Sequence, residues 1–584
     1  MSFKYDVLGH VRFGNELEDI LKLKGIQDIS SFLNPTLKNT ENKYLLENIT
    51  KARDIYTKHV GTSDCIDLIV DCDVDGYTSA SLIYQYTKRI NPDIEIRCLI
   101  HKGKIHGLSE FIDSVCEDDS KLVIIPDAGS GDVNECKKLI DIGKDVIILD
   151  HHNIRNKDKT IPENPAVVVN NQYSSKITDK AMTGVGIVYK FTQVLDEYYD
   201  LNYADDYLDL VALGMIGDRA DVIDLQTRYY VLKGLEQIRN KTNKNKLISV
   251  LTEVQMYSMN NSVTINGIGF YVCPLMNSMI RLGEYEDKCY MFEALCNSDK
   301  MLDRKVRGKG IVNMTIQEYT LKACQSSNRK QKKLTEESAT VLSEEISKFG
   351  LDKLPILVCN AKDNVDGNST GLIANRLADQ YQRPCLLMRR KGNICKGSGR
   401  GSDKCEILNF NQWCTETGLF TKVEGHPGAF GCEITFDNTN KLFSLLSTME
   451  KIDEPTYHVY NVYDSNQIHD QIIKNVAKYD YVWGNTVSSP LFLIKNIPCN
   501  KYNLYLLGAK QNKIEFTYHN IKFVKQTRGS SLASLYKEII SIVDNFEFDI
   551  VGRFSIDYKS GKAAQVLVED WMFRKSDKIQ GFFG

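Results

Sequence analysis

The sequence lacks any apolar stretch of about 18 residues, the length that a membrane-spanning helix requires. Its first residues, MSFKYDVLGH, contain no apolar signal region. No C-x-x-C pair occurs among the 16 cysteines, which are scattered, several of them in apolar runs. Scattered buried thiols in a large chain are typical of a reducing compartment and argue against a disulfide framework. We therefore expect a soluble, cytoplasmic protein that does not contact a membrane.

An excess of positive charge is missing too. The 73 Lys and Arg residues face 76 Asp and Glu residues, so the formal net charge is only −3. No global basic field marks a nucleic-acid binder, although a local groove can bind phosphates while the remaining surface is neutral. With 584 residues the chain should hold several domains, because single cores stop growing near about 250–300 residues.

Strand and helix signals alternate in the first third of the chain. Continuous apolar strands that alternate with helices predict a parallel, doubly wound α/β sheet covered on both faces. The predicted strands are Cys65–Val70, Ile94–Ile100, Lys121–Ile125, Val146–Leu149 and Val167–Val169.

The whole chain is predicted to form five parts. The charged stretches 303–309 and 328–333 are interpreted as belonging to a helical connector, and residues 450–545 match no pattern that we can name. The five parts are a helical lead-in (1–62), the doubly wound domain (63–230), the helical connector (231–350), a second, smaller α/β domain (351–448) and a β-rich C-terminal domain (449–584).

Four short acidic or histidine motifs follow apolar runs in the first two parts. Carboxylate oxygens together with an imidazole are ligands suited to a Mn²⁺- or Mg²⁺-like centre. Such centres carry out hydrolysis, most often of phosphate esters. Ligands placed just beyond strand ends also fit the rule that doubly wound sheets bind at their carboxyl edge. The motifs are Asp71-Cys72-Asp73-Val74-Asp75-Gly76, Pro126-Asp127-Ala128-Gly129, Asp150-His151-His152 and Gly217-Asp218-Arg219-Ala220-Asp221.

The order and wording of these motifs resemble the DHH phosphoesterases, and within them the RecJ single-strand exonucleases. Asp150-His151-His152 matches the triplet that names the family, and DCDVDGYTSA is similar to its first motif. Similar segments follow in the right order at 268–283, 371–384, 397–400 and 425–431, with a fainter likeness at 548–571. The resemblance implies a DHH domain, a DHH-associated phosphate-binding domain and a terminal OB-like barrel.

The resemblance also implies a pair of ions, Mn²⁺ or Mg²⁺, bridged by Asp127. Asp150 would orient an imidazole, and His152 would face the scissile phosphate as a donor or a proton carrier. The predicted catalytic residues are therefore Asp150, His151 and His152. The predicted metal ligands are Asp75, His151 and Asp218 for one ion, Asp73 with Asp71 for the other, and Asp127 for both.

Two positions depart from the family pattern. Many relatives carry a histidine where Ile69 stands, so one ion depends on Asp71, binds more weakly, or is absent at rest. In the fourth motif, counting from Ala212-Leu213-Gly214 selects Asp218, whereas matching the Ala-Asp-Val tripeptide of RecJ selects Asp221. We prefer Asp218, because it follows an apolar run at the distance that the wider family uses.

A second set of residues is predicted to hold the substrate. Free backbone N–H groups in glycine-rich segments, together with basic side chains, suit a phosphate. A narrow channel between the two α/β domains would thread one strand past the ions. The predicted phosphate contacts are Arg281, Arg376, Ser398, Gly399, Arg400, Gly425 and His426.

The leading hypothesis is a metal-dependent exonuclease that degrades single-stranded DNA from the 5′ end to 5′-mononucleotides, in recombination, repair or replication. A single-strand-binding protein or a helicase is a partner by family analogy. One alternative is a phosphodiesterase for short oligoribonucleotides or cyclic dinucleotides, whose members are typically shorter. Another is a catalytically silent replication scaffold, which the retained acids and His151 argue against.

Overall fold

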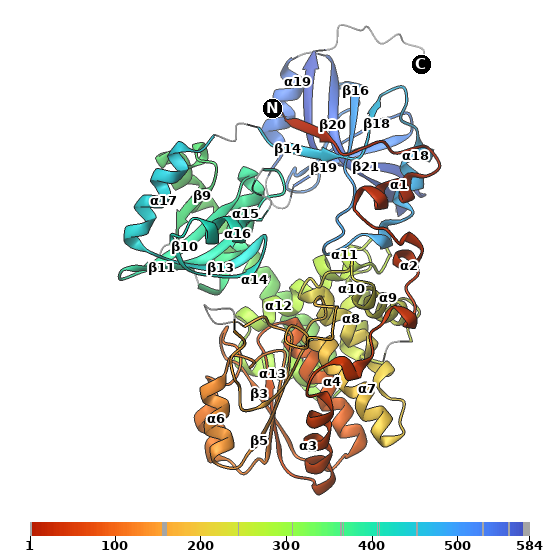
Figure 1. Ribbon diagram of the computed structural model, residues 1–584. Helices are drawn as coiled ribbons and strands as arrows, with labels where there is room; N and C mark the ends of the chain where they lie inside the picture. The colour runs from red at the N-terminus through yellow and green to blue at the C-terminus, as the bar shows by residue number, and fades with distance from the viewer. Residues whose placement is uncertain are drawn as a thin grey trace. The chain divides into compact units, whose positions relative to one another are not determined.

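The computed structural model describes residues 3–154, 160–242, 244–306, 308–361, 365, 367–405, 407, 409–450, 454–527, 531–542, 544–558 and 561–575. The chain forms two compact units (Figure 1). The N-terminal unit comprises Lys24–Asn328 with Tyr479–Ser489, and the C-terminal unit comprises Met1–Leu23, Arg329–Lys478 and Pro490–Gly584. Among the described residues, no helix is both long and apolar enough to cross a bilayer.

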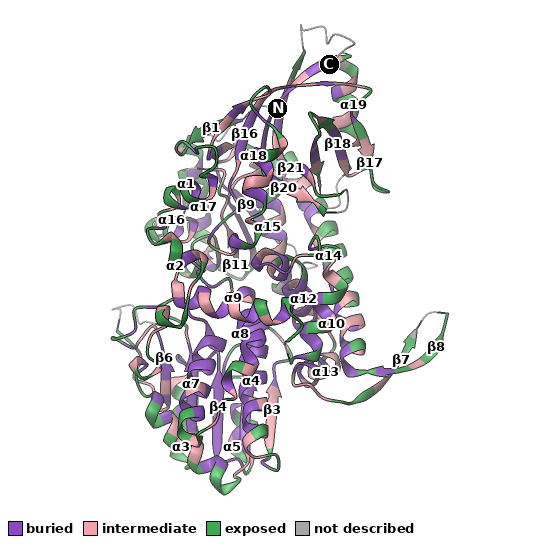
Figure 2. Ribbon diagram, turned by 90° about the vertical axis from the view of Figure 1, so that its right-hand side faces the viewer, coloured by how far each residue is buried: buried purple, intermediate pink, exposed green. Residues whose placement is uncertain are grey.

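The N-terminal unit is built on a five-stranded parallel sheet in the order β3-β2-β4-β5-β6. The central strands β2 and β4 are buried along their whole length, whereas the edge strand β3 is half-buried (Figure 2). This burial explains why the strands are continuous apolar runs without polar alternation. The strands are β2 (Ile66–Val70), β3 (Ile96–Ile100), β4 (Leu122–Pro126), β5 (Asp145–Asp150) and β6 (Val167–Asn170).

Helices cover both faces of this sheet, which confirms the predicted doubly wound fold. Ile69, Val123 and Ile148 lie on one face, in an apolar cluster with α5 and α6. The other face packs against α3, α4 and α7; α8 packs in turn on α4 and α7, and α9 packs on α8 (Figure 1). The helices are α3 (Ile49–Thr62), α4 (Val74–Ile90), α5 (Ile112–Glu117), α6 (Val133–Asp141), α7 (Gly184–Tyr199), α8 (Leu208–Gly217) and α9 (Leu225–Arg239).

The predicted connector is mostly helical but contains a β-hairpin. Residues 301–315 form the antiparallel pair β7 (Met301–Val306) and β8 (Gly310–Thr315), which projects from the helices in Figure 2. The helical prediction for 303–309 was therefore wrong: Gly308 and Gly310 have φ values of 78° and 75°, which favour a tight turn over a helix. The helices are α10 (Lys246–Gln255), α11 (Ile265–Gly267) with a π-turn (Ile268–Val272), α12 (Cys273–Leu282), α13 (Tyr285–Leu295) and α14 (Ile316–Phe349).

The C-terminal unit contains the smaller α/β sheet, in the order β12-β13-β11-β10-β9. Only its β9–β10 pair is parallel among the described strands. Its elements are β9 (Leu357–Asn360), α15 (Thr370–Tyr381), β10 (Cys385–Lys391), β11 (Ile394–Arg400), α16 (Phe410–Glu416), β12 (Phe420–His426), β13 (Ala429–Thr435) and α17 (Phe436–Thr448).

A seven-stranded sheet, in the order β15-β16-β20-β21-β19-β18-β17, forms the predicted β-rich end of the chain. Phe548, Phe554 and Trp571 are buried in it. Its elements are β15 (Val462–Asp464), α18 (Asp470–Ala477), β16 (Phe492–Asn500), β17 (Tyr505–Leu507), β18 (Lys513–Tyr518), β19 (Ile521–Gln526), α19 (Ala533–Ile542), β20 (Asn545–Asp557) and β21 (Ala563–Lys575).

The predicted helical lead-in begins with a strand. Before α1 (Glu16–Leu23) and α2 (Ile29–Leu33), β1 (Lys4–Val7) pairs in parallel with β14 (Thr456–Val459). The ring of Phe3 also meets that of Tyr457 edge-on, with centroids 5.6 Å apart. A strand whose partner lies so far along the chain leaves no local periodic signal, so the all-helical prediction for 1–62 was wrong here. The boundaries of the five predicted parts stay predictions.

A buried arginine ties the lead-in of the N-terminal unit to its distant 479–489 segment. Arg228 is fully buried; its Nε donates to the Phe32 carbonyl at 2.5 Å, and Nη2 donates to the Val482 carbonyl at 3.3 Å. We expect Arg228→Ala to lower the free energy of unfolding by about 2–4 kcal/mol, because two buried carbonyls lose their donor and a cavity remains. Urea denaturation measures this loss. Lys233→Ala, on the exposed side of the same helix, is the control; equal effects would contradict the assignment.

Candidate metal centre at the carboxyl edge of the parallel sheet

The four motifs meet at one edge of the sheet because of the strand order. After β2, the chain adds β3 on one side of it and then crosses over to add β4, β5 and β6 on the other side. Doubly wound sheets bind their ligands at such a switch point. The first motif follows β2, Asp127 follows β4, and Asp150 ends β5. Asp218 arrives separately, at the C-terminal end of α8.

The carboxylates of the first motif are held by helix N-termini. Asp73 caps α4, where its Oδ1 accepts a hydrogen bond from the Gly76 amide at 3.0 Å. Asp75 is buried, and its two oxygens accept from the amides of Gly184 at 2.8 Å and Val185 at 3.2 Å, at the start of α7. Amide donors at helix starts stabilise negative charge. Both side chains are thereby fixed before any ligand arrives.

Asp127 sits at the centre of the site in a strained backbone conformation. Its φ of 64° lies in the left-handed region, which is uncommon outside glycine. The residue is 1% exposed, and Oδ1 forms no hydrogen bond of good geometry with the described residues, although His151 Nε2 lies 3.2 Å from it. A buried carboxylate oxygen without a donor is costly unless something else, such as a cation, satisfies it. Strain and an unsatisfied oxygen at one residue point to a functional role.

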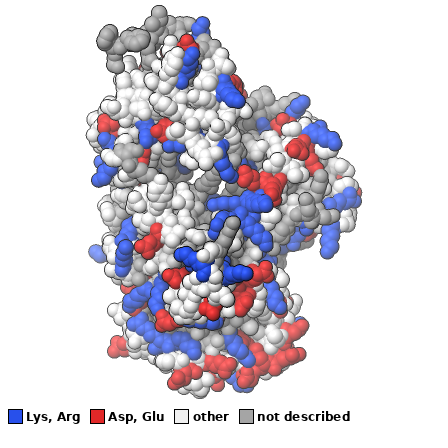
Figure 3. Space-filling model, turned by 180° about the vertical axis from the view of Figure 1, so that it is seen from behind, with Lys and Arg blue, Asp and Glu red and all other residues white. Residues whose placement is uncertain are grey.

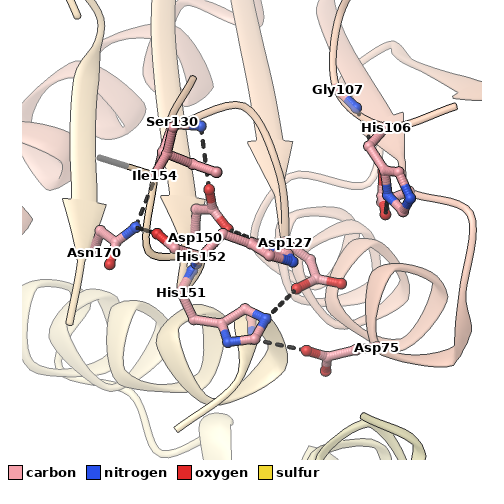
Figure 4. Close-up of polar contacts among 12 residues, drawn as sticks. Asp75, His106, Gly107, Asp127, Ser130, Asp150, His151, His152, Ile154 and Asn170 are labelled. Carbon is pink, nitrogen blue, oxygen red and sulfur yellow. Dashed lines mark hydrogen bonds and ion pairs between the residues drawn. The ribbon is translucent and has the colours of Figure 1, made fainter. Parts of the chain in front are cut away.

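A buried acid orients the ring of His152 and holds the backbone of His151. Asp150 accepts hydrogen bonds from the Ser130 amide at 3.1 Å, the His151 amide at 2.7 Å and His152 Nδ1 at 2.8 Å. The His151 ring points toward Asp127 (Figure 4), with Nε2 3.2 Å from Asp127 Oδ1 and 3.7 Å from Asp218 Oδ2. Asp150 therefore lies behind the histidines.

Asp150 and His152 shift each other's pKa. Burial acts to raise the pKa of Asp150, but the hydrogen bond and charge of His152 outweigh it and leave that pKa below its usual value. Burial acts to lower the pKa of His152, and its hydrogen bond to Asp150 raises it instead, to about 9. The Asp150–His152 pair is thus a charged pair near neutral pH.

The remaining carboxylates destabilise one another's charges. Burial, then the charge of neighbouring acids, raises the pKa of Asp127 and Asp218 well above the usual value and that of Asp75 to about 7. A divalent cation would remove this cost, and hard oxygen donors with one imidazole suit Mn²⁺ or Mg²⁺. The residues present therefore fit such ions. Among the described residues, ligand atoms within 4.8 Å of one another occur in four sets: Asp75, His151 and Asp218; Asp127, His151 and His152; Asp71, Asp73 and Asp127; and Asp71, Cys72 and His106.

Of the two candidates in the fourth motif, Asp218 lies in this cluster. Asp221 is exposed; its Oδ1 accepts from the Ile223 amide at 2.9 Å and from the Thr486 hydroxyl. Asp221 thus holds a turn and the returning 479–489 segment, which is a structural role.

Sequence reasoning missed His106. Its Nδ1 lies 2.7 Å from Asp71 Oδ2, and the Cys72 Sγ is 3.7 Å from the ring. The hydrogen bond to Asp71, then that to Cys72, raises the pKa of His106 to about 11. The residue lies in the loop that follows β3, which was predicted as the strand Ile94–Ile100, so its place after a parallel strand was the one signal that pointed to the carboxyl edge.

The predicted phosphate contacts are divided between the two units. Arg281 lies in the last turn of α12 in the N-terminal unit, where burial lowers its pKa and the charge of Asp73 opposes that shift. In the C-terminal unit, Arg400 of β11 and His426 of β12 both pair with Ala429 of the strand between them. Beside them, Ser398 Oγ lies 3.0 Å from Thr370 Oγ1, at the start of α15. Gly399, Gly425 and Arg376 occupy β11, β12 and α15.

A doubly wound sheet with acids and paired histidines at its carboxyl edge defines a DHH-type domain. The model of the DHH family, N-terminal domain, matches residues 66–215. The putative SPβ prophage-derived single-strand DNA-specific exonuclease YorK of Bacillus subtilis strain 168 is 34% identical over 562 residues, covering 94% of this chain and 95% of YorK. This chain therefore belongs to the DHH family, among its RecJ-like members.

More distant relatives are also RecJ proteins. The single-stranded-DNA-specific exonuclease RecJ of the same bacterium is 23% identical, covering 90% of this chain and 63% of RecJ. The crystal structure of RecJ from Thermus thermophilus in complex with Mn²⁺ matches with a TM-score of 0.71 at 18% identity, over 96% of this chain and 76% of that chain. The same protein in complex with Mg²⁺ matches with a TM-score of 0.66 at 17% identity, over 96% and 75% of the chains. This likeness confirms the fold.

Substitution of the two acids of the fourth motif should affect Mn²⁺ affinity differently. We expect Asp218→Ala to weaken Mn²⁺ binding by about tenfold or more, because a ligand is lost. Asp221→Ala should leave affinity within about twofold, because its contacts are structural. Calorimetric titration with Mn²⁺ measures the affinity of both variants. In the wild type, EDTA should lower the melting temperature, because it removes a ligand that binds the folded state. A larger loss of affinity in Asp221→Ala would reverse the assignment.

Gly184 is expected to tolerate no side chain. A Cβ there would lie 2.3 Å from Asp127 Oδ1. Gly184→Ala should therefore displace the Asp127 carboxylate and reduce Mn²⁺ affinity, although residue 184 is no ligand. Gly61→Ala, in a helix with open space around the added methyl group, is the matched control and should bind Mn²⁺ normally. Unchanged binding in Gly184→Ala would show that the packing around Asp127 is loose.

Proposed function

We propose that this chain is a metal-dependent exonuclease that degrades single-stranded DNA from its 5′ end to 5′-mononucleotides. The observation that carries the proposal is the cluster of Asp127, Asp218 and His151, in a chain whose relative YorK is named a putative single-strand DNA-specific exonuclease. The relatives crystallised with Mn²⁺ and Mg²⁺ support these ions for this chain as well.

The metal ions, when bound, supply an activated water and neutralise the charge of the scissile phosphodiester. Asp127 would bridge the two ions, Asp75, His151 and Asp218 would hold one, and Asp71 and Asp73 the other. Asp150 binds Nδ1 of His152, which leaves Nε2 as the ring nitrogen that can face the substrate. His152 thus presents an N–H group to a phosphate oxygen or to the leaving group.

The strand is proposed to be held by local sites and not by a basic surface. Basic and acidic side chains are intermingled on the face shown in Figure 3, in keeping with the net charge of −3. Arg281 would contact the phosphate near the ions. In the C-terminal unit, Arg400 and His426 lie at one level of the sheet, because both pair with Ala429. A phosphate would be held there by Ser398, Gly399, Arg400, Gly425 and His426, with Arg376.

We also propose a cytoplasmic setting for this protein. All 16 cysteines are free thiols, which suits a reducing cytoplasm. A single-strand-binding protein or a helicase is proposed as a partner, and residues 450–545 are a region where it could dock.

Product analysis on end-labelled oligonucleotides tests the proposal. We expect a 5′ label to be released at once as a mononucleotide from single-stranded DNA, in Mn²⁺ or Mg²⁺ but not in EDTA. Asp127→Asn keeps the shape of the side chain and tolerates a positive φ. It should lower the rate by about 10²–10³-fold, because a bridging ligand is weakened.

Duplex DNA, RNA and short oligoribonucleotides serve as comparison substrates. Preference for short oligoribonucleotides would favour a phosphodiesterase instead. Binding of single-stranded DNA without cleavage in either metal would favour the silent scaffold.

A further inference from the structure

The ligand set predicted for the second ion, as distinct from the ion held by Asp75, His151 and Asp218, contains no imidazole. Asp71, Asp73 and Asp127 offer only carboxylate oxygens. The position at which many relatives carry a histidine is Ile69, which is 0% exposed. Its side chain packs in the apolar cluster between β2, β4 and α5, together with Leu108. No ligand can therefore come from position 69.

An imidazole reaches the same acid from another direction. His106 Nδ1 lies 2.7 Å from Asp71 Oδ2, and His106, Asp71 and Cys72 place ligand atoms within 4.8 Å of one another. The His106 side chain is 50% exposed, whereas that of Asp71 is 1% exposed. The ring thus stands between the buried acid and solvent, on a loop separate from that of His151 (Figure 4).

The loop that carries His106 is held in place by its neighbours. His101, at its start, is buried and contacts Glu110 at 2.7 Å. The Leu108 amide, at its end, donates to Asp132 Oδ2 at 2.7 Å. Between them Gly107 has a φ of 71°, and a Cβ there would lie 2.1 Å from Asp132 Oδ2, so glycine is required. The anchoring fixes where the His106 ring lies.

We propose that His106 is a ligand of the second metal ion and supplies the imidazole that position 69 does not. The inference rests on the proposed metal-dependent function. The loop that carries His106 also carries Leu108, which packs in the same apolar cluster as Ile69. Cys72 is a weaker candidate, since a soft sulfur ligand does not suit Mn²⁺ or Mg²⁺. The competing role for His106 is a simple ion pair that neutralises Asp71.

Substitutions of opposite charge separate these two roles. A ligand role predicts that His106→Asp, which offers a hard oxygen, retains the second ion better than His106→Lys, which offers only positive charge. An ion-pair role predicts the reverse. His106→Ala should weaken the second Mn²⁺ by about tenfold or more. It should leave the first ion, held by Asp75, His151 and Asp218, in place.

The measurement is calorimetric titration of the full-length protein with Mn²⁺, alongside nuclease rates at low and high Mn²⁺. Ile105→Ala, an exposed neighbour on the same loop, is the control and should bind two ions. Retention of the second ion in His106→Lys but not in His106→Asp would overturn the inference, as would a wild type that binds one ion only. A wild type that binds no Mn²⁺ and cleaves nothing would instead overturn the proposed function. The two failures are therefore distinct.

Discussion

The crowding of buried carboxylates around Asp127 is the constraint on which the rest of the N-terminal unit depends. Acids packed this closely repel one another, and burial removes the water that would screen them. The fold offsets part of this cost with the amides that begin α4 and α7, which hold Asp73 and Asp75. Bound cations would offset the rest of the repulsion between these carboxylates. The strained backbone of Asp127 and the glycine at position 184 both follow from the need to bring its carboxylate into that space.

The histidines show how neighbouring residues set the behaviour of the ligands. Asp150 accepts hydrogen bonds from the backbone amides of both histidines but from the ring of His152 alone, and so it fixes the His152 imidazole. His151 and His152 have different surroundings although they are adjacent. His151 Nε2 lies 3.2 Å from Asp127 and its side chain is 14% exposed, whereas the side chain of His152 is 47% exposed.

Features coded by contiguous residues could be predicted from the sequence, whereas pairings between distant residues could not. The doubly wound sheet could be predicted because each strand is a continuous apolar run and each motif adjoins a strand end. The hairpin at 301–315 was mistaken for a helix because its charged residues resemble a solvated helix face, and only the turn glycines indicated otherwise. Strand β1 was missed because its partner, β14, is contributed by residues 456–459.

By itself, the sequence determined the chemistry: which acids and histidines are present, in which order, and at which strand ends. That information is local, because apolar runs and the motifs beside them are contiguous in the chain. Only the tertiary structure decided between Asp218 and Asp221, since the two differ by three positions and are distinguished by what surrounds them. It also brought His106 to Asp71, 35 residues away. Such a meeting depends on the order of the strands in space, which no spacing along the chain encodes.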